Sequence, residues 1–274
     1  MDTDRSTRTA LPLFLAPIVM LAGLGAMIAV ALPASWLGVR PALLIAESLL
    51  VAPSLLALAL FQIPLGMALG LRAISFRTAT LSLAAGASLW ALSLGLFETQ
   101  YVFWPPPPEY LDAFRRLHDA LRPRDTFDAL LSVAAIAVAP AVCEEVLFRG
   151  VVLPSFATRL PPAAAVLGSA FLFGLIHVDA TADAIAFYRV PFAFVVGIGL
   201  GVLRVTAGSL LPPVLAHALL NTITFAVAAQ EDLTQTPEPR LALGVPLFAG
   251  GLAATVFLLR MINRTRSTSR DQER

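Results

Sequence analysis

The sequence predicts an all-α, polytopic transmembrane helix bundle of about eight spans with both termini cytoplasmic. Of its 274 residues, 58% are hydrophobic and 14% are charged, whereas about a quarter of the residues in a soluble domain are charged. Apolar segments recur that are long enough to cross roughly 30 Å of hydrocarbon, which takes about 20 helical residues each. The arginines between these segments are unevenly distributed, which is typical of membrane proteins.

Eight segments are candidate spans. The first carries no charge; we interpret it as a retained span because it is longer than a signal-peptide core and further spans follow. The sixth is short and contains Gly197, Gly199 and Gly201, which favours close helix packing. The predicted spans cover residues 11–32, 41–60, 80–97, 127–156, 163–178, 190–203, 210–228 and 241–262.

The loop charges indicate the orientation. An even number of spans places both termini on one side, and most of the arginines fall on that side, whereas those opposite are mixed with acidic residues. Positive residues stay in the cytoplasm, so we expect cytoplasmic termini. The net charge of +1 gives no reason to expect nucleic acid as a partner. The single cysteine, Cys143, excludes an intramolecular disulfide and a multi-cysteine metal cluster.

The longest connection, residues 98–126, joins the third and fourth spans. Four prolines, Pro105 to Pro108, favour extended backbone. Leu111, Phe114, Leu117 and Leu121 then recur at helical spacing between charges, which predicts an amphipathic helix at the membrane surface. We interpret it as a surface connector rather than a substrate gate, and we leave its histidine, His118, out of any site.

Three regions follow from this organisation. Residues 1–124 would hold the N-terminal spans and the connector, 125–229 the catalytic core, and 230–274 the last span and a cytoplasmic tail that we expect to be disordered after Ile262.

Ionisable residues within a span are costly and indicate function by default. The fourth span contains Glu144, Glu145 and Arg149. Glu145 and Arg149 are four residues apart and share a helix face, so they can pair, while Glu144 is rotated by roughly 100°. A purely structural ion pair would account for Glu145 and Arg149 but not for Glu144. The sequence therefore predicts Glu144 as a general base or acid.

Two histidines lie in later spans. His177 ends the fifth span, one turn after Phe173, and His217 lies in the seventh, one turn before Asn221. Each histidine alone is more typical of packing between helices, but together with the glutamates they indicate a site. His217 and Asn221 share a face and can present donors to one oxyanion. Phe173 is most simply a packing wall.

The depths of these residues are only partly consistent. At 1.5 Å per residue, Glu144 and His177 lie about 22 and 25 Å from a turn near Leu160. His217 lies only about 13 Å from Gly208, so the seventh span must start deeper, tilt strongly, or begin earlier than predicted.

These residues resemble the motifs of the CPBP family of intramembrane proteases, which includes CaaX prenyl endopeptidases and bacteriocin-processing or self-immunity (Abi-type) proteins. The family pattern is Glu-Glu-x-x-x-Arg, then Phe-x-x-x-His, then His-x-x-x-Asn or Asp on successive helices. The chain has this order between about Asp125 and Ala229: Glu144, Glu145 and Arg149; Phe173 and His177; His217 and Asn221.

The resemblance implies an intramembrane endopeptidase that hydrolyses a peptide bond with activated water. Glu144 and His177 would deprotonate the water, His217 and Asn221 would stabilise the oxyanion, and Glu145 with Arg149 would brace Glu144. We prefer a mechanism without cofactor, although zinc would accept Glu144, His177 and His217 as ligands. The expected partners are membrane lipids and a membrane-anchored, prenylated or otherwise apolar peptide substrate, in the bacterial inner membrane.

Two other functions stay open. A non-catalytic membrane immunity or scaffolding protein could retain these motifs as a structural core. A proton-coupled transporter is disfavoured because the two halves of the chain show no paired repeats.

Overall fold

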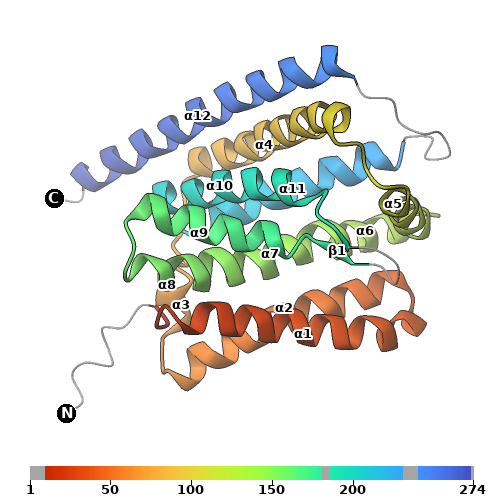
Figure 1. Cartoon of the computed structure of the whole chain (residues 1–274). Coiled ribbons are helices and arrows are strands. Elements are labelled where there is room, and N and C mark those ends of the chain that lie inside the picture. Colours follow the sequence, from red (N-terminus) through yellow and green to blue (C-terminus); the bar gives the residue numbers. More distant parts are fainter. Residues whose placement is uncertain (1–9, 181–184, 231–239, 273–274) are drawn as a thin grey trace.

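A computed structural model of the chain describes residues 10–180, 185–230 and 240–272. All eight predicted apolar segments form helices that run along the bundle (Figure 1). The helix in the fourth segment is divided by changes of helical pitch into α6, α7 and α8. The main helices are α1 (Leu15–Ala34), α2 (Val39–Leu60), α4 (Phe76–Phe103), the continuous helix Thr126–Ala157, α9 (Pro162–Leu175), α10 (Val190–Ala207), α11 (Leu211–Ala228) and α12 (Leu241–Gln272).

Six of these helices are long and apolar enough to cross a membrane, among the residues that the structure describes. The two exceptions are α9, with 14 residues, and the apolar part of α1, Leu15–Val30. Large apolar side chains such as Phe76, Phe103 and Phe127 are exposed on the outer surface, which lipid can cover but water would not. These features indicate an integral, multi-pass membrane protein, with six candidate membrane-spanning helices by length and composition where the sequence predicted eight.

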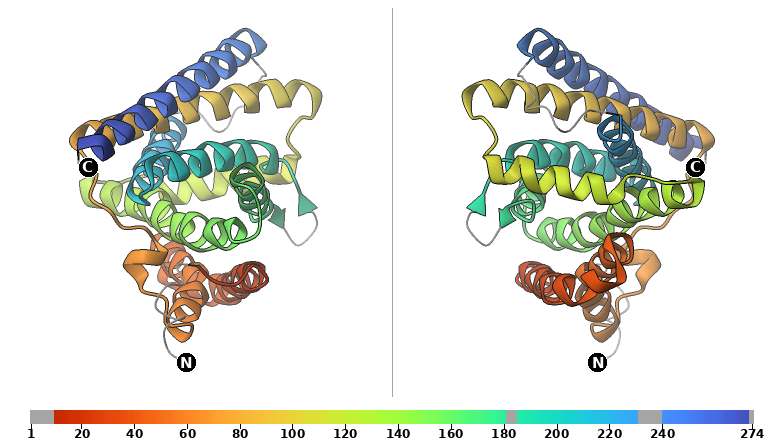
Figure 2. Two further views of the ribbon diagram at one scale, coloured as in Figure 1. Left: turned by 90° about the vertical axis from the view of Figure 1, so that its left-hand side faces the viewer. Right: turned by 90° about the vertical axis from the view of Figure 1, so that its right-hand side faces the viewer.

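The helices form successive layers (Figure 2). The pair α1 and α2 lies on one side, and α4 and α12 lie on the other, packed against each other. The layer between them contains Thr126–Ala157, α9, α10 and α11, and α11 packs against α4. The start of α1 and the end of α12 lie at the same end of the bundle (Figure 1). The helix α12 continues to Gln272, beyond the predicted end of the last span at Ile262.

The helix Thr126–Ala157 contains two π-helical segments. They are Ala134–Val138, between α6 (Thr126–Val133) and α7 (Ala139–Glu145), and Val146–Val152, which precedes α8 (Leu153–Ala157). Pro140 and Pro154 follow directly in the first turns of α7 and α8. Proline has no N–H and clashes with the carbonyl four residues earlier, and a wider turn relieves both problems.

Shorter elements connect the helices. The predicted amphipathic helix is α5 (Pro108–Leu121), and its His118 is buried, with the ring lying on Phe114. A two-stranded antiparallel ribbon, β1 (Asp179–Ala180) and β2 (Ile185–Ala186), is an addition to the predicted all-α fold. The remaining pieces are the 3₁₀ turn Ser35–Leu37 and α3 (Leu65–Ala68).

The start of α11 explains the depth of His217. The helix begins at Leu211, so an earlier start is not the explanation. The turn before it is buried: the Leu210 N–H donates to the Gly70 carbonyl, and Leu210 shares a core cluster with Val151. Val151 is followed by six more residues of its own helix. These contacts favour a deeper start of the seventh span over an earlier one, and a deeper start was one of the predicted solutions.

Candidate active site

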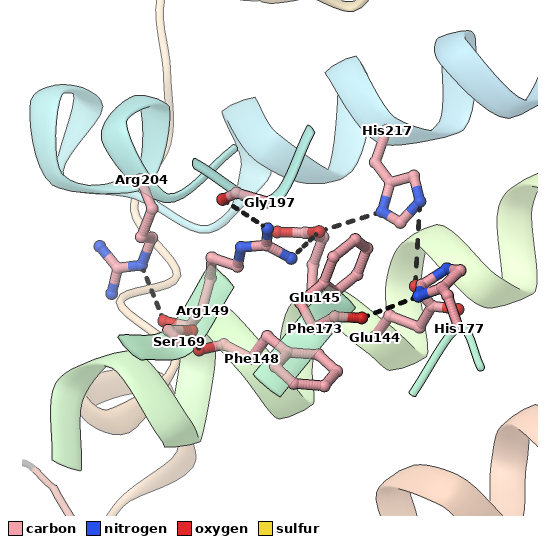
Figure 3. Close-up of polar contacts among 10 residues, drawn as sticks. All are labelled: Glu144, Glu145, Phe148, Arg149, Ser169, Phe173, His177, Gly197, Arg204 and His217. Carbon is pink, nitrogen blue, oxygen red and sulfur yellow. Dashed lines mark hydrogen bonds and ion pairs between the residues drawn. The ribbon is translucent and has the colours of Figure 1, made fainter. Parts of the chain in front are cut away.

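Glu145 is the centre of a buried hydrogen-bond network. Its side chain has 0% exposure, and its Oε1 accepts from Arg149 Nη1 at 2.7 Å and from His217 Nδ1 at 3.0 Å (Figure 3). The network joins the helix Thr126–Ala157 to α11. The pairing of Glu145 with Arg149 is therefore confirmed, and His217 is a second partner that the sequence did not indicate.

Arg149 is buried with 1% exposure and is bound on several sides. Its Nη2 donates to the Gly197 carbonyl at 2.9 Å, and its guanidinium lies over the Phe173 ring, 4.5 Å from the ring centroid. Charge-assisted bonds and the aromatic face replace the water that a buried guanidinium would otherwise lack. Arg149 thus connects its own helix to both α9 and α10.

Glu144 has different surroundings from its neighbour. Its side chain is also buried, but no hydrogen bond joins it to the other described residues, and its Oε2, like Oε2 of Glu145, is buried without a partner. The nearest imidazole nitrogen is Nε2 of His217, at 3.9 Å from Oε2 (Figure 3). A buried carboxylate oxygen without a partner is costly to keep, and such groups occur preferentially at functional sites.

Both histidines are oriented through Nδ1. Nδ1 of His217 donates to Glu145, and Nδ1 of His177 donates to the Phe173 carbonyl at 2.8 Å. Carboxylate and carbonyl oxygens can only accept, so Nδ1 carries the hydrogen in each ring. The neutral form of each ring therefore has its acceptor lone pair on Nε2, the nitrogen that is left for the site.

A cavity of about 170 Å³ adjoins these groups. Its wall contains Glu144 and His177, so the two residues that were predicted to act on water face one space. The cavity lies where α1, α2 and α7 meet the end of α9 and the start of α10. The full lining is Met27, Glu47, Leu50, Glu144, Ile176, His177, Val178 and Arg189.

Phe173 occupies the middle of the site. Its ring meets Phe148 edge to face at a centroid distance of 5.1 Å, and the His177 and His217 rings lie 4.8 and 5.9 Å away. Its predicted role as a packing wall is confirmed. Asn221 lies one turn beyond His217 and is half-buried, and no hydrogen bond joins it to the other described site residues.

Glu47 was missed by the sequence analysis. It lies on α2, outside the three motifs, yet its side chain lines the cavity and its Oε2 is buried without a hydrogen-bond partner. A single carboxylate in an apolar span was the available signal, but nothing in the sequence connects α2 with α7. Among the described residues, no three His, Cys, Asp or Glu side chains are grouped as a metal site.

Comparison with known families identifies the central part of the chain. Residues 126–223 match the family described as type II CAAX prenyl endopeptidase, Rce1-like. No curated protein and no solved structure matches the chain. The matched residues contain all three motifs, and the buried cluster of Glu144, Glu145 and His217 is consistent with them.

Proposed function

We propose that this chain, whose residues 126–223 are an Rce1-like CAAX prenyl endopeptidase domain of an intramembrane protease family, cleaves a peptide bond near the C-terminus of a prenylated, membrane-anchored substrate. The observation that carries the proposal is the unpartnered Oε2 of Glu144, which faces a cavity together with His177. The neighbouring ionisable groups Glu145 and Arg149 are engaged with each other. Among the three motifs, Glu144 is thus the carboxylate that is available to a water molecule in the cavity.

Water activation follows from this arrangement. A water in the cavity donates one hydrogen bond to the carboxylate of Glu144 and another to the acceptor Nε2 of His177. Glu144 takes the proton as the water oxygen attacks the substrate carbonyl carbon. A positioned base of this kind contributes typically 10²- to 10⁴-fold to the rate.

We assign the stabilisation of the oxyanion, the substrate oxygen that becomes negative, to His217 and Asn221. When Nε2 of His217 carries a proton, it donates to the developing negative oxygen, and the Asn221 amide is a second donor from the same face of α11. Glu145 accepts from Nδ1 of the same ring, so its negative charge compensates the imidazolium. Donors that are oriented before the reaction stabilise the transition state without reorganising.

The membrane supplies the substrate. A prenylated C-terminal peptide is held at the membrane by its lipid, and the apolar surroundings of the site fit such a segment. The arginine distribution of its loops supports about eight spans with cytoplasmic termini, and we place the protein in the bacterial inner membrane. No metal or other cofactor takes part in these steps.

The test is cleavage of a farnesylated peptide ending in a Cys-aliphatic-aliphatic-X sequence by the full-length protein in proteoliposomes. Mass spectrometry would measure release of the C-terminal tripeptide. We expect Glu144→Gln and His177→Ala each to lower the rate by about 100-fold or more. Glu109→Gln makes the same chemical change on the exposed face of α5 and should leave the rate unchanged.

The opposite result would favour a non-catalytic role. If both site variants released the tripeptide at the rate of the unmodified protein, Glu144 would not be the base. An immunity or scaffolding function that survives Glu144→Gln would then be the better account.

A further inference from the structure

The cavity beside Glu144 holds a second carboxylate that none of the recognised motifs includes. Glu47 comes from α2, which packs against α7 (Figure 1). Both Glu47 and Glu144 line the cavity, and Oε2 of each is buried without a hydrogen-bond partner. Glu47 lies outside residues 126–223, so the family match assigns it no role.

Two carboxylates in one small buried space do not both ionise readily, because like charges repel strongly where water is scarce. Arg189, on the same cavity wall, is an opposite charge that offsets part of this repulsion. Among the described residues, the other polar or charged groups on the cavity wall are His177 and Arg189, and Cys143 lies beside Glu144. Arg149 is already bound to Glu145 and to the Gly197 carbonyl. A pair of this kind is most stable when it holds one proton.

We infer that Glu47 is a further catalytic residue, which shares one proton with Glu144 and donates it to the nitrogen that leaves. The inference rests on the proposed function. The water oxygen bonds to the carbonyl carbon, and the water gives a proton to Glu144. The carbon–nitrogen bond breaks, and the nitrogen takes the proton of Glu47. The proton on Glu144 returns to Glu47, which restores the starting state.

In this reaction Glu144 is the general base and Glu47 is the general acid. Glu144 lies near His217, shares the cavity wall with His177 and acts on water, whereas Glu47 reaches the same cavity from α2. An amine is expelled from a tetrahedral intermediate only when its nitrogen is protonated. A residue in this position would therefore matter most for substrates with a basic leaving group.

The first experiment compares two leaving groups in full-length Glu47→Gln protein. One substrate is the farnesylated peptide, and the other replaces its scissile amide by a thioester, whose thiolate leaves unprotonated because a thiol has a pKa of about 8.5. We expect about a 100-fold loss with the amide and less than a few-fold loss with the thioester. Glu47→Asp, which keeps an acid, should recover part of the amide activity. Ser48→Ala, on an exposed position of α2, should behave like the unmodified protein with both substrates.

The second experiment needs no substrate. Infrared difference spectra at neutral pH report the carbonyl stretch of a protonated carboxyl group, and we expect Glu47→Gln to remove one such band while Glu109→Gln removes none. Equal losses with amide and thioester would overturn the inference in favour of a structural role, as would an unchanged infrared band. If the unmodified protein cleaved neither substrate, the proposed function itself would fail, and the acid role of Glu47 with it. The infrared band would then still show whether the two carboxyls share a proton.

Discussion

At the scale of single residues, the site depends on the different surroundings of two adjacent glutamates. Successive residues of a helix point about 100° apart, so Glu145 faces Arg149 and His217 while Glu144 faces the cavity. The i, i+4 spacing was enough to predict the Glu145 pair and the free Glu144. It could not predict His217 as a partner of Glu145, because that contact depends on where α11 begins.

Glu145→Gln should destabilise the protein much more than Glu144→Gln. Removing the Glu145 charge leaves the Arg149 guanidinium buried without a carboxylate, which costs about 3–5 kcal/mol. Glu144→Gln removes a carboxylate with an unpartnered oxygen and should cost little. Thermal unfolding of the two variants in the same detergent would measure the difference. Equal unfolding midpoints would contradict the structural role of Glu145.

Metal removal should leave the activity intact. Because water activation is assigned to Glu144 and His177 alone, we expect exhaustive chelation to leave the rate of tripeptide release within about two-fold of its starting value, a change smaller than 1 kcal/mol. Metal analysis of the purified protein by mass spectrometry would accompany the rate. Activity that is lost on chelation and restored by zinc at one equivalent per chain would refute this mechanism.

At the scale of helices, close packing sets the position of the site residues. The expected tight contacts of the α10 glycines are present: a Cβ on Gly197 would lie 3.1 Å from Ala170 Cα, and one on Gly201 would lie 3.0 Å from Val166 Cγ1. The sequence predicted this packing from composition. It did not predict the two π-helical segments on either side of α7, because proline within an apolar run is compatible with several local responses.

Gly86→Ala should impair both folding and cleavage. A Cβ on Gly86 would clash with the backbone of Ala216, lying 2.9 Å from its carbonyl carbon and Cα, and backbone atoms cannot move aside singly. The shift would displace His217, the next residue of α11, and we expect about a ten-fold or greater loss of rate, equal to about 1.4 kcal/mol of transition-state stabilisation.

Two further glycines provide matched controls for that change. A Cβ on Gly250 meets nothing within 4 Å, whereas one on Gly251 would lie 2.5 Å from Leu92 N. We expect Gly250→Ala to be neutral and Gly251→Ala to lower the unfolding temperature without a matching loss of activity in the folded fraction. Full activity in folded Gly86→Ala protein would show that the packing of α4 does not position His217.

At the scale of the whole molecule, hydropathy predicted the helices well and their crossings less well. All eight apolar segments are helical, but α9 has only 14 residues, or about 21 Å at 1.5 Å per residue. Composition alone could not show the short length of α9. The predicted span continues past Leu175 to Val178, whereas the helix ends before His177. Glu47 was missed for a related reason, since contact between α2 and α7 is a property of the assembled bundle.

Orientation can be tested independently of catalysis. If α1, α2 and α4 each cross the membrane, the segment around Arg122 and Arg124 lies opposite the termini. We expect green fluorescent protein fused after the last residue to fluoresce in the cytoplasm, and alkaline phosphatase fused after Arg124 to be active outside it. The reverse pattern would show that the arginine distribution does not set the topology of this chain.

The proposed role of Glu144 is to activate a water molecule for hydrolysis inside the bilayer. The most direct test is cleavage of the farnesylated peptide in ¹⁸O-labelled water, followed by mass spectrometry of the new C-terminal carboxylate. The account predicts one ¹⁸O atom in the product from the unmodified protein and no labelled product above background from Glu144→Gln in the same proteoliposomes. Labelled product from Glu144→Gln at the unmodified rate would contradict it.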